Sequence, residues 1–160
     1  GCGHGRGLGA LAARAAKGQV VGIDPSRLMV EIAAKRNRRL VKANRVRAVV
    51  AAVETLPFPD GAFDKALCVH VVYFWPDLNV ALAEIARVLK PGGRLALLFR
   101  TNANTAAVQS FPSDVYRFPS LAEMVTALAT AGFSIDAGET TGDENAGPVL
   151  LVAERVGLRS

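Results

Sequence analysis

Glycine occupies every second position at the start of the chain, which reads GCGHGRGLGA. Because glycine has no Cβ atom, a loop of this kind lets backbone N–H groups approach a polar or anionic ligand closely. A helix that begins in the loop adds the positive end of its dipole. The stretch contains two spacings, GxGxG and the dinucleotide-type GxGxxA, and a tight turn without a ligand is the third interpretation.

Asp24 follows a short apolar stretch, QVVGI at residues 19–23, about twenty residues after the glycines. At that place a carboxylate can accept hydrogen bonds from both hydroxyls of a ribose. An aspartate after a strand can also cap the next helix, but Ser26 is already available as the N-cap. We therefore favour a ribose-binding role for Asp24.

Apolar runs alternate with segments of helical period, which predicts an α/β fold with a mostly parallel sheet. The irregular stretch LPFPDG at 56–61 has two prolines and an Asp-Gly pair, so it predicts neither helix nor strand. No strand precedes the glycine loop, although such loops normally follow one. We expect helices at 6–17, 26–40, 77–90 and 120–131, and strands at 19–23, 46–52, 65–72, 94–99, 133–137 and 148–154.

The 160 residues, half of them apolar, predict one domain over residues 1–160. No apolar run approaches the roughly 20 residues that cross a bilayer, and no signal peptide is evident, so we expect a cytoplasmic protein without a membrane segment. Cys2 and Cys68 are too few for a disulfide framework and lack the spacing of metal ligands. We expect reduced thiols and no bound metal.

The formal net charge of +5 raises the possibility of a nucleic-acid partner. Aromatic residues for base stacking do not interleave the basic residues, which favours a solvated helix face over a nucleic-acid site. The basic residues concentrate in one segment and comprise Arg27, Lys35, Arg36, Arg38, Arg39, Lys42, Arg45 and Arg47.

Three stretches together resemble the class I S-adenosylmethionine-dependent methyltransferases, in particular the small-molecule enzymes of the methyltransferase domain 11 type. They are GCGHG, LPFPDGAFD at 56–64 and EIARVLKPGGRLAL at 84–97. The resemblance implies a Rossmann-like fold with a mostly parallel seven-strand sheet flanked by helices. In that family a central strand precedes the glycine loop, so the chain is expected to be truncated at its N-terminus, to lack this first central strand and to fold poorly alone.

The same resemblance assigns residues to S-adenosylmethionine. The family commonly has an acidic residue that receives the adenine amino group within a GDAE-like sequence, and Ala52 replaces that acid here. Glu54 is expected to substitute for it in part. The implied cofactor-binding residues are Gly1, Cys2, Gly3 and Gly5 beneath the methionine part, Asp24 at the ribose, Pro25, Ala52, Val53 and Glu54 at the adenine, and Val69 near the methyl group.

The acceptor side of the site is expected after the strand that contains Cys68. The cysteines fit small buried residues better than nucleophiles, because no local acid–base partner is evident. His70 is a candidate base, although a histidine at a strand end is at least as often a packed residue. No catalytic residue is established, and His70 and Tyr73 are the candidates.

Aromatic residues at 73–75 lie where this family forms part of its acceptor pocket, which is mostly apolar in small-molecule sites. They can equally cover the end of the sheet. Arg100 suits an acceptor that carries a carboxylate or phosphate. The expected substrate-pocket residues are His70, Tyr73, Trp75, Arg100 and Tyr116, with Arg117 and Phe118 nearby.

The activity implied is methyl transfer from S-adenosylmethionine to a small molecule by in-line displacement, leaving S-adenosylhomocysteine. Such a reaction depends mainly on proximity and orientation, and it needs a base only when the acceptor must lose a proton. Ala52 and the missing strand favour a second possibility, a cofactor-binding or interaction domain that has lost catalysis. The basic segment favours a nucleic-acid methyltransferase, and the GxGxxA spacing alone favours a nicotinamide oxidoreductase.

Overall fold

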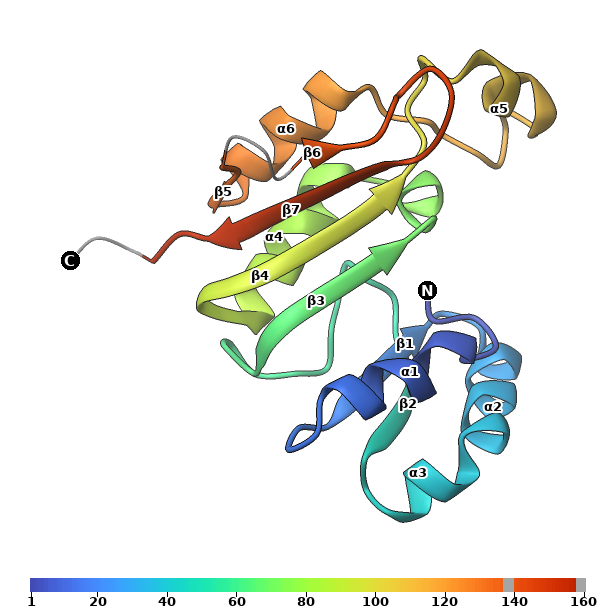
Figure 1. The fold of residues 1–160 in the computed structure, drawn as a ribbon, viewed down its shortest axis with the longest axis vertical. Helices are drawn as coiled ribbons and strands as arrows, with labels where there is room; N and C mark the ends of the chain where they lie inside the picture. Colours follow the sequence, from blue (N-terminus) through green and yellow to red (C-terminus); the bar gives the residue numbers. More distant parts are fainter. Residues whose placement is uncertain (137–139, 158–160) are drawn as a thin grey trace. The chain divides into compact units, whose positions relative to one another are not determined.

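A computed structural model describes residues 1–136 and 140–157 of the chain. These residues divide into two compact units, Gly1–Pro57 and Phe58–Ser160 (Figure 1). The strands accordingly form two sheets, one in each unit. A single domain over residues 1–160 stays a prediction.

The first unit pairs two parallel strands and packs helices against them. Val20 lies opposite Val46 in the strand pair, so both strands end at the same edge. The core of the unit consists of Leu8, Ala12, Ala33 and Val46, each from a helix or strand. The elements in chain order are α1 (Arg6–Arg14), β1 (Val20–Asp24), α2 (Arg27–Arg36), α3 (Arg38–Lys42) and β2 (Val46–Val50).

Side-chain hydrogen bonds set the ends of the helices in this unit. Ser26 caps α2 as expected, because its Oγ accepts the Met29 N–H at 3.3 Å. The Arg45 guanidinium donates to the carbonyls of Ala12 and Ala15 at 2.7 and 2.6 Å, so α1 ends at Arg14 rather than at residue 17. The helix expected at 26–40 is divided at Asn37 into α2 and α3.

The second unit contains a five-stranded sheet in the order β3-β4-β7-β5, with β6 also paired to β7. β3 and β4 are parallel, whereas β7 runs antiparallel to β4. The elements are β3 (Phe63–Val69), the 3₁₀ helix η1 (Val72–Phe74), α4 (Leu78–Val88), β4 (Leu89–Phe99), α5 (Thr105–Ser110), α6 (Leu121–Thr130), β5 (Phe133–Ser134), β6 (Thr140–Thr141) and β7 (Val149–Arg155).

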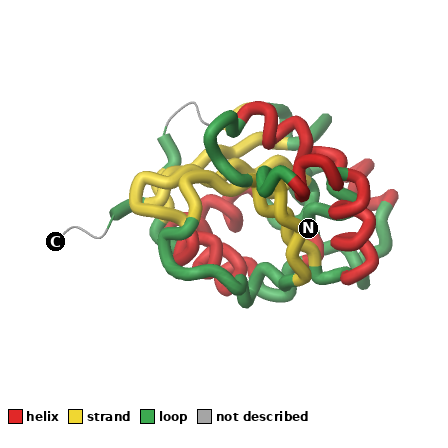
Figure 2. Tube along the Cα trace, turned by 90° about the horizontal axis from the view of Figure 1, so that it is seen from below, coloured by secondary structure: helices red, strands yellow, loops and turns green. Residues whose placement is uncertain are grey.

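Alternation along β4 and β7 separates a buried face of this sheet from a partly exposed one. Leu95, Leu97 and Phe99 are completely buried, whereas Leu98 between them is only partly covered. α4 packs against β4 and α6. In Figure 1, α4 lies behind β4 and β7, and the rotated view in Figure 2 shows red helical turns beneath the yellow strands. The core of this unit therefore lies between the sheet and one layer of helices.

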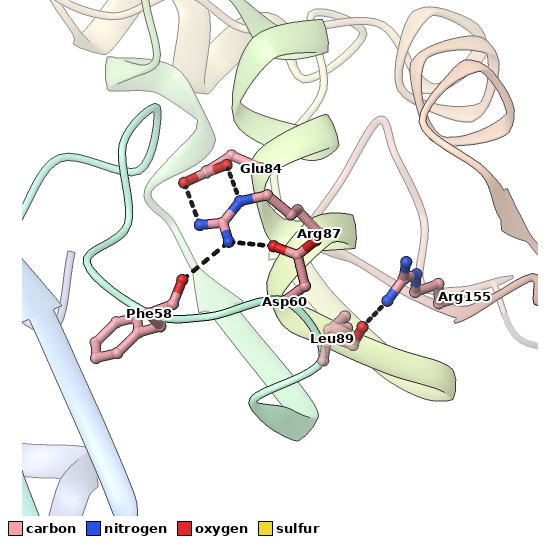
Figure 3. Close-up of polar contacts among 6 residues, drawn as sticks. All are labelled: Phe58, Asp60, Glu84, Arg87, Leu89 and Arg155. Atoms are coloured by element: carbon pink, nitrogen blue, oxygen red, sulfur yellow. Dashed lines mark hydrogen bonds and ion pairs between the residues drawn. The ribbon is translucent and has the colours of Figure 1, made fainter.

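The irregular segment at 56–61 is confirmed, and Arg87 of α4 anchors its second half. The Arg87 guanidinium donates to the Phe58 carbonyl at 2.9 Å and to Asp60 Oδ1 at 2.7 Å, while its other nitrogens bond Glu84 (Figure 3). The Glu84 and Asp60 carboxylates raise the pKa of Arg87. Nearby, Arg155 of β7 donates to the Leu89 carbonyl, which ties the start of β4 to the last strand.

Several element boundaries differ from the expected ones. α4 ends at Val88, and β4 already begins at Leu89, because Pro91-Gly92-Gly93 forms an irregularity within the strand rather than a gap before it. β3 ends at Val69, not at residue 72, since the backbone turns at His70. The strand expected at 133–137 is limited to Phe133–Ser134, and Ala137 lies outside the described residues. α5 and β6 were not expected.

The parallel pairs β1–β2 and β3–β4 agree with the expected parallel core, although the other pairings of the larger sheet are antiparallel. β3 is an edge strand of its sheet, and Leu67 and Val69 on it are 49% and 44% exposed. The absence of a first central strand stays a prediction.

Candidate functional site

Left-handed glycines and a close helix contact shape the N-terminal loop. Gly3 and Gly5 have φ of +50° and +71°, which glycine adopts without strain. A Cβ atom on Gly5 would lie 2.7 Å from the Cβ of Ala33, so a side chain there would push α2 away. Asn37 Nδ2 donates to the Gly5 and Ala33 carbonyls, both at 2.9 Å. The loop is therefore held in one backbone conformation against α2.

The Asp24 carboxylate joins this loop to the end of β1. It is nearly buried, and its Oδ2 accepts the Gly3 N–H at 2.8 Å while its Oδ1 accepts the Ser26 N–H at 3.0 Å. An ionised carboxylate offers about four acceptor positions. Asp24 thus orders two loops and retains capacity to accept hydrogen bonds from ligand hydroxyls.

The turn after β2 lies at the same edge of the first unit. The Ala51 N–H donates to the Asp24 carbonyl at 3.1 Å, and the Thr55 N–H closes a turn onto the Ala52 carbonyl at 3.3 Å. Ala52 and Pro25 are exposed, and Val53 and Glu54 are partly exposed. The unit therefore brings together the glycine loop, Asp24, Pro25 and the turn at 52–54, as the sequence predicts for a nucleoside site.

The backbone N–H groups at the beginning of α1 add hydrogen-bond donors next to the glycine loop. Gly5 occupies the N-cap position without a side-chain hydrogen bond to the helix, and the first turn holds no acidic residue. The first N–H groups of a helix need acceptors, and they favour anionic or polar groups. These donors and the remaining Asp24 acceptor positions fit a ligand that combines a diol with a carboxylate.

In the second unit, the candidate site residues gather where β3 ends. His70 has φ of +53°, a conformation that costs most non-glycine residues about 1–2 kcal/mol and that histidine adopts more often than most. The His70 N–H donates to the Leu98 carbonyl at 2.8 Å, which holds the turn against β4.

A single hydroxyl joins three of the predicted pocket residues. The Tyr73 hydroxyl lies 2.9 Å from His70 Nδ1 and accepts the Arg100 backbone N–H at 2.6 Å. Tyr73 is 5% exposed, so these contacts are shielded from water. Burial lowers the pKa of His70, and the nearby positive charge of Arg100 lowers it further. His70 is therefore mainly neutral at pH 7.

Aromatic rings from two segments surround Tyr73. Its ring lies 4.7 Å from that of Phe118, and Tyr116 lies 4.8 Å from Phe74 and 4.6 Å from Phe111 between ring centroids. Phe74 and Phe111 are 50% and 42% exposed. These five residues are the aromatic cluster, in which Phe74 and Phe111 present apolar surface to solvent while the buried Tyr73 ring lies 6.1 Å from that of His70.

Among the described residues, Trp75 makes no ring contact with the aromatic cluster. It is 8% exposed and lines a small cavity of about 20 Å³ with Val72, Leu78 and Pro119. Its position is that of a core residue beneath the start of α4. Its role in the substrate pocket stays a prediction.

Both cysteines carry a protonated thiol at neutral pH. Burial raises the pKa of Cys68 to about 11, and burial also raises that of Cys2, with a smaller effect from Asp24. Within residues 1–136 and 140–157, no three His, Cys, Asp or Glu residues lie together as metal ligands would. Over the same residues, no helix has the length and apolar character needed to span a bilayer.

A shallow groove of about 440 Å³ lies elsewhere in the second unit, between the start of α4 and α6. Asp77, Asn79, Arg117 and Glu123 supply its polar lining, and Arg117 and Glu123 approach within 3.9 Å. Arg117, which the sequence places near the acceptor pocket, lines this groove, whereas His70, Tyr73, Arg100 and Tyr116 do not. Among the residues expected to bind a cofactor or acceptor, the groove therefore includes Arg117 alone.

Sequence reasoning missed two residues that shape these sites, Asn37 and Phe111. Asn37 lies within the helix expected at 26–40, and only the apolar residues one helical turn away, Ala33 and Leu40, indicate that its side chain faces the core. Phe111 lies beside a proline in the polar segment before Tyr116, and nothing local predicts its contact with that ring.

Comparison with known proteins decides the family. A family model described as a methyltransferase domain matches residues 1–97, more than half of the chain. The chain belongs to this methyltransferase domain family. The expectation of a class I S-adenosylmethionine-dependent methyltransferase is therefore confirmed, and with it the cofactor class.

Relatives of this methyltransferase domain are mostly longer than the chain. Demethylmenaquinone methyltransferase from Thermus thermophilus is 32% identical over 151 residues, which cover 78% of the chain and 68% of that relative. Matches to two other curated proteins span only 28% and 56% of their lengths.

Solved structures show the same fold. Geranyl diphosphate C-methyltransferase from Streptomyces coelicolor, in complex with Mg²⁺, geranyl diphosphate and S-adenosyl-L-homocysteine, gives a TM-score of 0.78 at 22% identity and covers 98% of this chain and 69% of its own. The [4+2]-cyclase SpnF gives 0.79 at 24% identity, covering 98% and 74%. The Rossmann-like fold is thus confirmed, and a cyclase with this fold shows that the fold does not fix the reaction.

Proposed function

We propose that the chain transfers the methyl group of S-adenosylmethionine to a small apolar molecule by in-line displacement. The observation that best supports cofactor binding is the Asp24 carboxylate, which organises the glycine loop through Gly3 and still has acceptor positions for a ribose diol. Membership in the methyltransferase domain family supports the same reaction class.

The first unit supplies the proposed contacts to the nucleoside. Asp24 would accept hydrogen bonds from the ribose hydroxyls, and Pro25 would cover one face of the adenine. The backbone of Ala52 and Val53 would meet the adenine ring, with Glu54 in part replacing the acid usual at Ala52. The loop residues Gly1, Cys2, Gly3 and Gly5 would hold the methionine part.

The second unit supplies the proposed acceptor pocket, formed by His70, Tyr73, Arg100 and Tyr116. The aromatic cluster offers exposed apolar surface from Phe74 and Phe111, and Arg100 at the end of β4 suits an anionic group. The name of one relative includes demethylmenaquinone and that of one structural neighbour includes geranyl diphosphate, whose geranyl chain is apolar and whose diphosphate is anionic.

Alignment is the main catalytic contribution expected of this protein. S-adenosylmethionine supplies a methyl group already activated by its positive sulfur. The chain has to place the acceptor atom in line with that methyl group and exclude water, which requires rigid loops and an apolar pocket. The fixed glycine loop and the aromatic cluster are suited to these two tasks.

Calorimetric titration of S-adenosylhomocysteine into the full natural chain tests the cofactor assignment. We expect saturable binding and no binding of NADH. Asp24→Asn removes the charge that the ribose hydroxyls contact and should weaken binding about 10- to 100-fold. Asp136→Asn, at an exposed position outside the first unit, should bind like the parent. Equal affinity of both variants would refute the Asp24 role.

Ala52 supports a second candidate, a cofactor-binding domain that has lost methyl transfer. Without the usual acid, the adenine amino group has no side-chain acceptor at that position. Binding of S-adenosylhomocysteine without transfer of a labelled methyl group to any apolar phenol, quinol or prenyl acceptor would favour this candidate over the enzyme.

A further inference from the structure

The Tyr73 hydroxyl has two polar neighbours in the described part of the chain, and together they determine where its proton lies. The Arg100 backbone N–H can only donate, so the Tyr73 oxygen is the acceptor of that 2.6 Å bond. The second neighbour is His70 Nδ1 at 2.9 Å. A buried hydroxyl proton without an acceptor is unfavourable, and His70 Nδ1 is the available acceptor.

This arrangement selects one form of the imidazole. If Tyr73 donates to Nδ1, that nitrogen carries no proton, and the proton of the neutral ring lies on Nε2. A protonated ring would direct an N–H at an oxygen that already accepts from Arg100, and would leave the Tyr73 proton without a partner. Burial disfavours the imidazolium form of His70, and the positive charge of the Arg100 guanidinium disfavours it further.

We propose that Tyr73 is a positioning residue that holds His70 as its neutral Nε2–H tautomer, and that His70 thereby donates a hydrogen bond to an oxygen of the acceptor. In the described residues, Nε2 has no protein partner, and His70 is exposed at the end of β3. His70 then determines specificity rather than acting as the base.

The substrate class follows from this donor and its surroundings, and this step rests on the proposed methyltransferase function. An Nε2–H beside the Arg100 guanidinium favours an ionised oxygen. The exposed rings of Phe74 and Phe111 favour a flat apolar body next to it. Together they indicate a phenolate or enolate acceptor that has already lost its proton when it binds.

The tautomer can be measured directly by ¹⁵N NMR on the full natural chain labelled at histidine. The sequence of residues 1–160 contains two histidines, and His4 serves as an internal reference. We expect His70 to show a pyrrole-type Nε2 and a pyridine-type Nδ1 at pH 7. Tyr73→Phe should populate both tautomers and raise the pKa of His70, whereas Tyr116→Phe, which keeps the Tyr73 hydroxyl, should change neither.

A pyrrole-type Nδ1 in the parent, or an unchanged tautomer in Tyr73→Phe, would overturn the positioning role. The tautomer measurement needs neither cofactor nor acceptor. Its result therefore tests the role of Tyr73 separately from the cofactor assignment, which the calorimetric titration tests. The acceptor oxygen is tested with 4-nitrophenol, whose phenolate form absorbs visible light. The parent should bind the phenolate about tenfold more tightly than His70→Ala does, and equal or absent binding would refute the donor role.

Discussion

The two units form their candidate binding sites in different ways. In the first unit, the backbone forms most of the candidate site. Gly3 and Gly5 adopt left-handed conformations, and the Asp24 carboxylate accepts hydrogen bonds from backbone N–H groups. In the second unit, side chains from separate segments meet, with the Tyr73 hydroxyl between His70 and Arg100 and the aromatic rings around it. Backbone sites depend on local spacing, whereas side-chain sites depend on how distant segments pack.

This difference predicts unequal tolerance to substitution. A loop whose glycines touch a neighbouring helix cannot accept a side chain without moving that helix. An exposed aromatic surface can change its residues with little effect on stability. The first unit should therefore fix the cofactor, while the second allows the acceptor to vary.

The largest effect is expected at Gly5. Gly5→Ala combines a left-handed φ with a Cβ atom 2.7 Å from that of Ala33, and should lower the free energy of unfolding by about 3 kcal/mol. Gly7→Ala is the matched control, because Gly7 is helical with open space around its Cβ direction, and it should stabilise by about 0.5 kcal/mol. Urea unfolding measures both, and similar changes in the two variants would contradict the backbone account.

A somewhat smaller loss is expected at Asn37. Asn37→Ala removes two hydrogen bonds and leaves the buried Gly5 carbonyl with only the longer bond from the Leu8 N–H at 3.4 Å, which should cost about 2 kcal/mol. Asn102 has an exposed side chain, and Asn102→Ala should cost less than about 0.5 kcal/mol. Thermal unfolding followed by circular dichroism distinguishes the two, and an Asn37 variant as stable as the control would exclude its role in holding the loop.

In the second unit, Tyr73→Phe should have a more modest effect. The variant keeps the ring contacts but leaves the Arg100 N–H without its acceptor, so we expect a loss of about 1 kcal/mol. Tyr116→Phe should change the unfolding free energy very little. A loss at Tyr73 as large as that expected for Gly5→Ala would remove the contrast between the units.

The smallest change in the unfolding free energy is expected from the protonation of His70 as pH falls. Its pKa is lowered in the folded protein, so the unfolded chain binds the proton more readily. The contribution of neutral His70 to the unfolding free energy is complete above the pKa of the unfolded chain, about 6.5. It is lost as pH falls through the lower pKa that His70 has in the folded protein. Unfolding free energies at pH 7.5 and 5.5 should show this loss in His4→Gln but not in His70→Gln, and the reverse pattern would contradict it.

Features that depend on residue type and short-range spacing were predicted correctly from the sequence. The glycine loop, Asp24 after a short strand, the Ser26 cap and the irregular segment at 56–61 all follow from residue type and spacing, and each lies where expected. The division of the basic helix at Asn37 was missed, since it depends on a hydrogen bond to the Gly5 carbonyl, 32 residues away.

The acceptor side was predictable only in part. His70, Tyr73, Arg100 and Tyr116 were identified as candidates. The connection of the first three through the Tyr73 hydroxyl, however, depends on the register between β3 and β4. Phe111 joins the cluster because of the path of the chain after α5, a path that no local pattern indicates. Trp75 shows the converse case, because this aromatic residue, two positions after Tyr73, was expected in the pocket but is buried and lines a different small cavity.

The most direct test of the central claim is hydrogen–deuterium exchange of the full natural chain with and without S-adenosylhomocysteine. If the first unit holds the cofactor through its backbone, residues 1–9, 24–27 and 51–55 should become protected, while the exposed basic segment at 38–43 should not change. Binding that leaves these three loops unprotected would contradict the account.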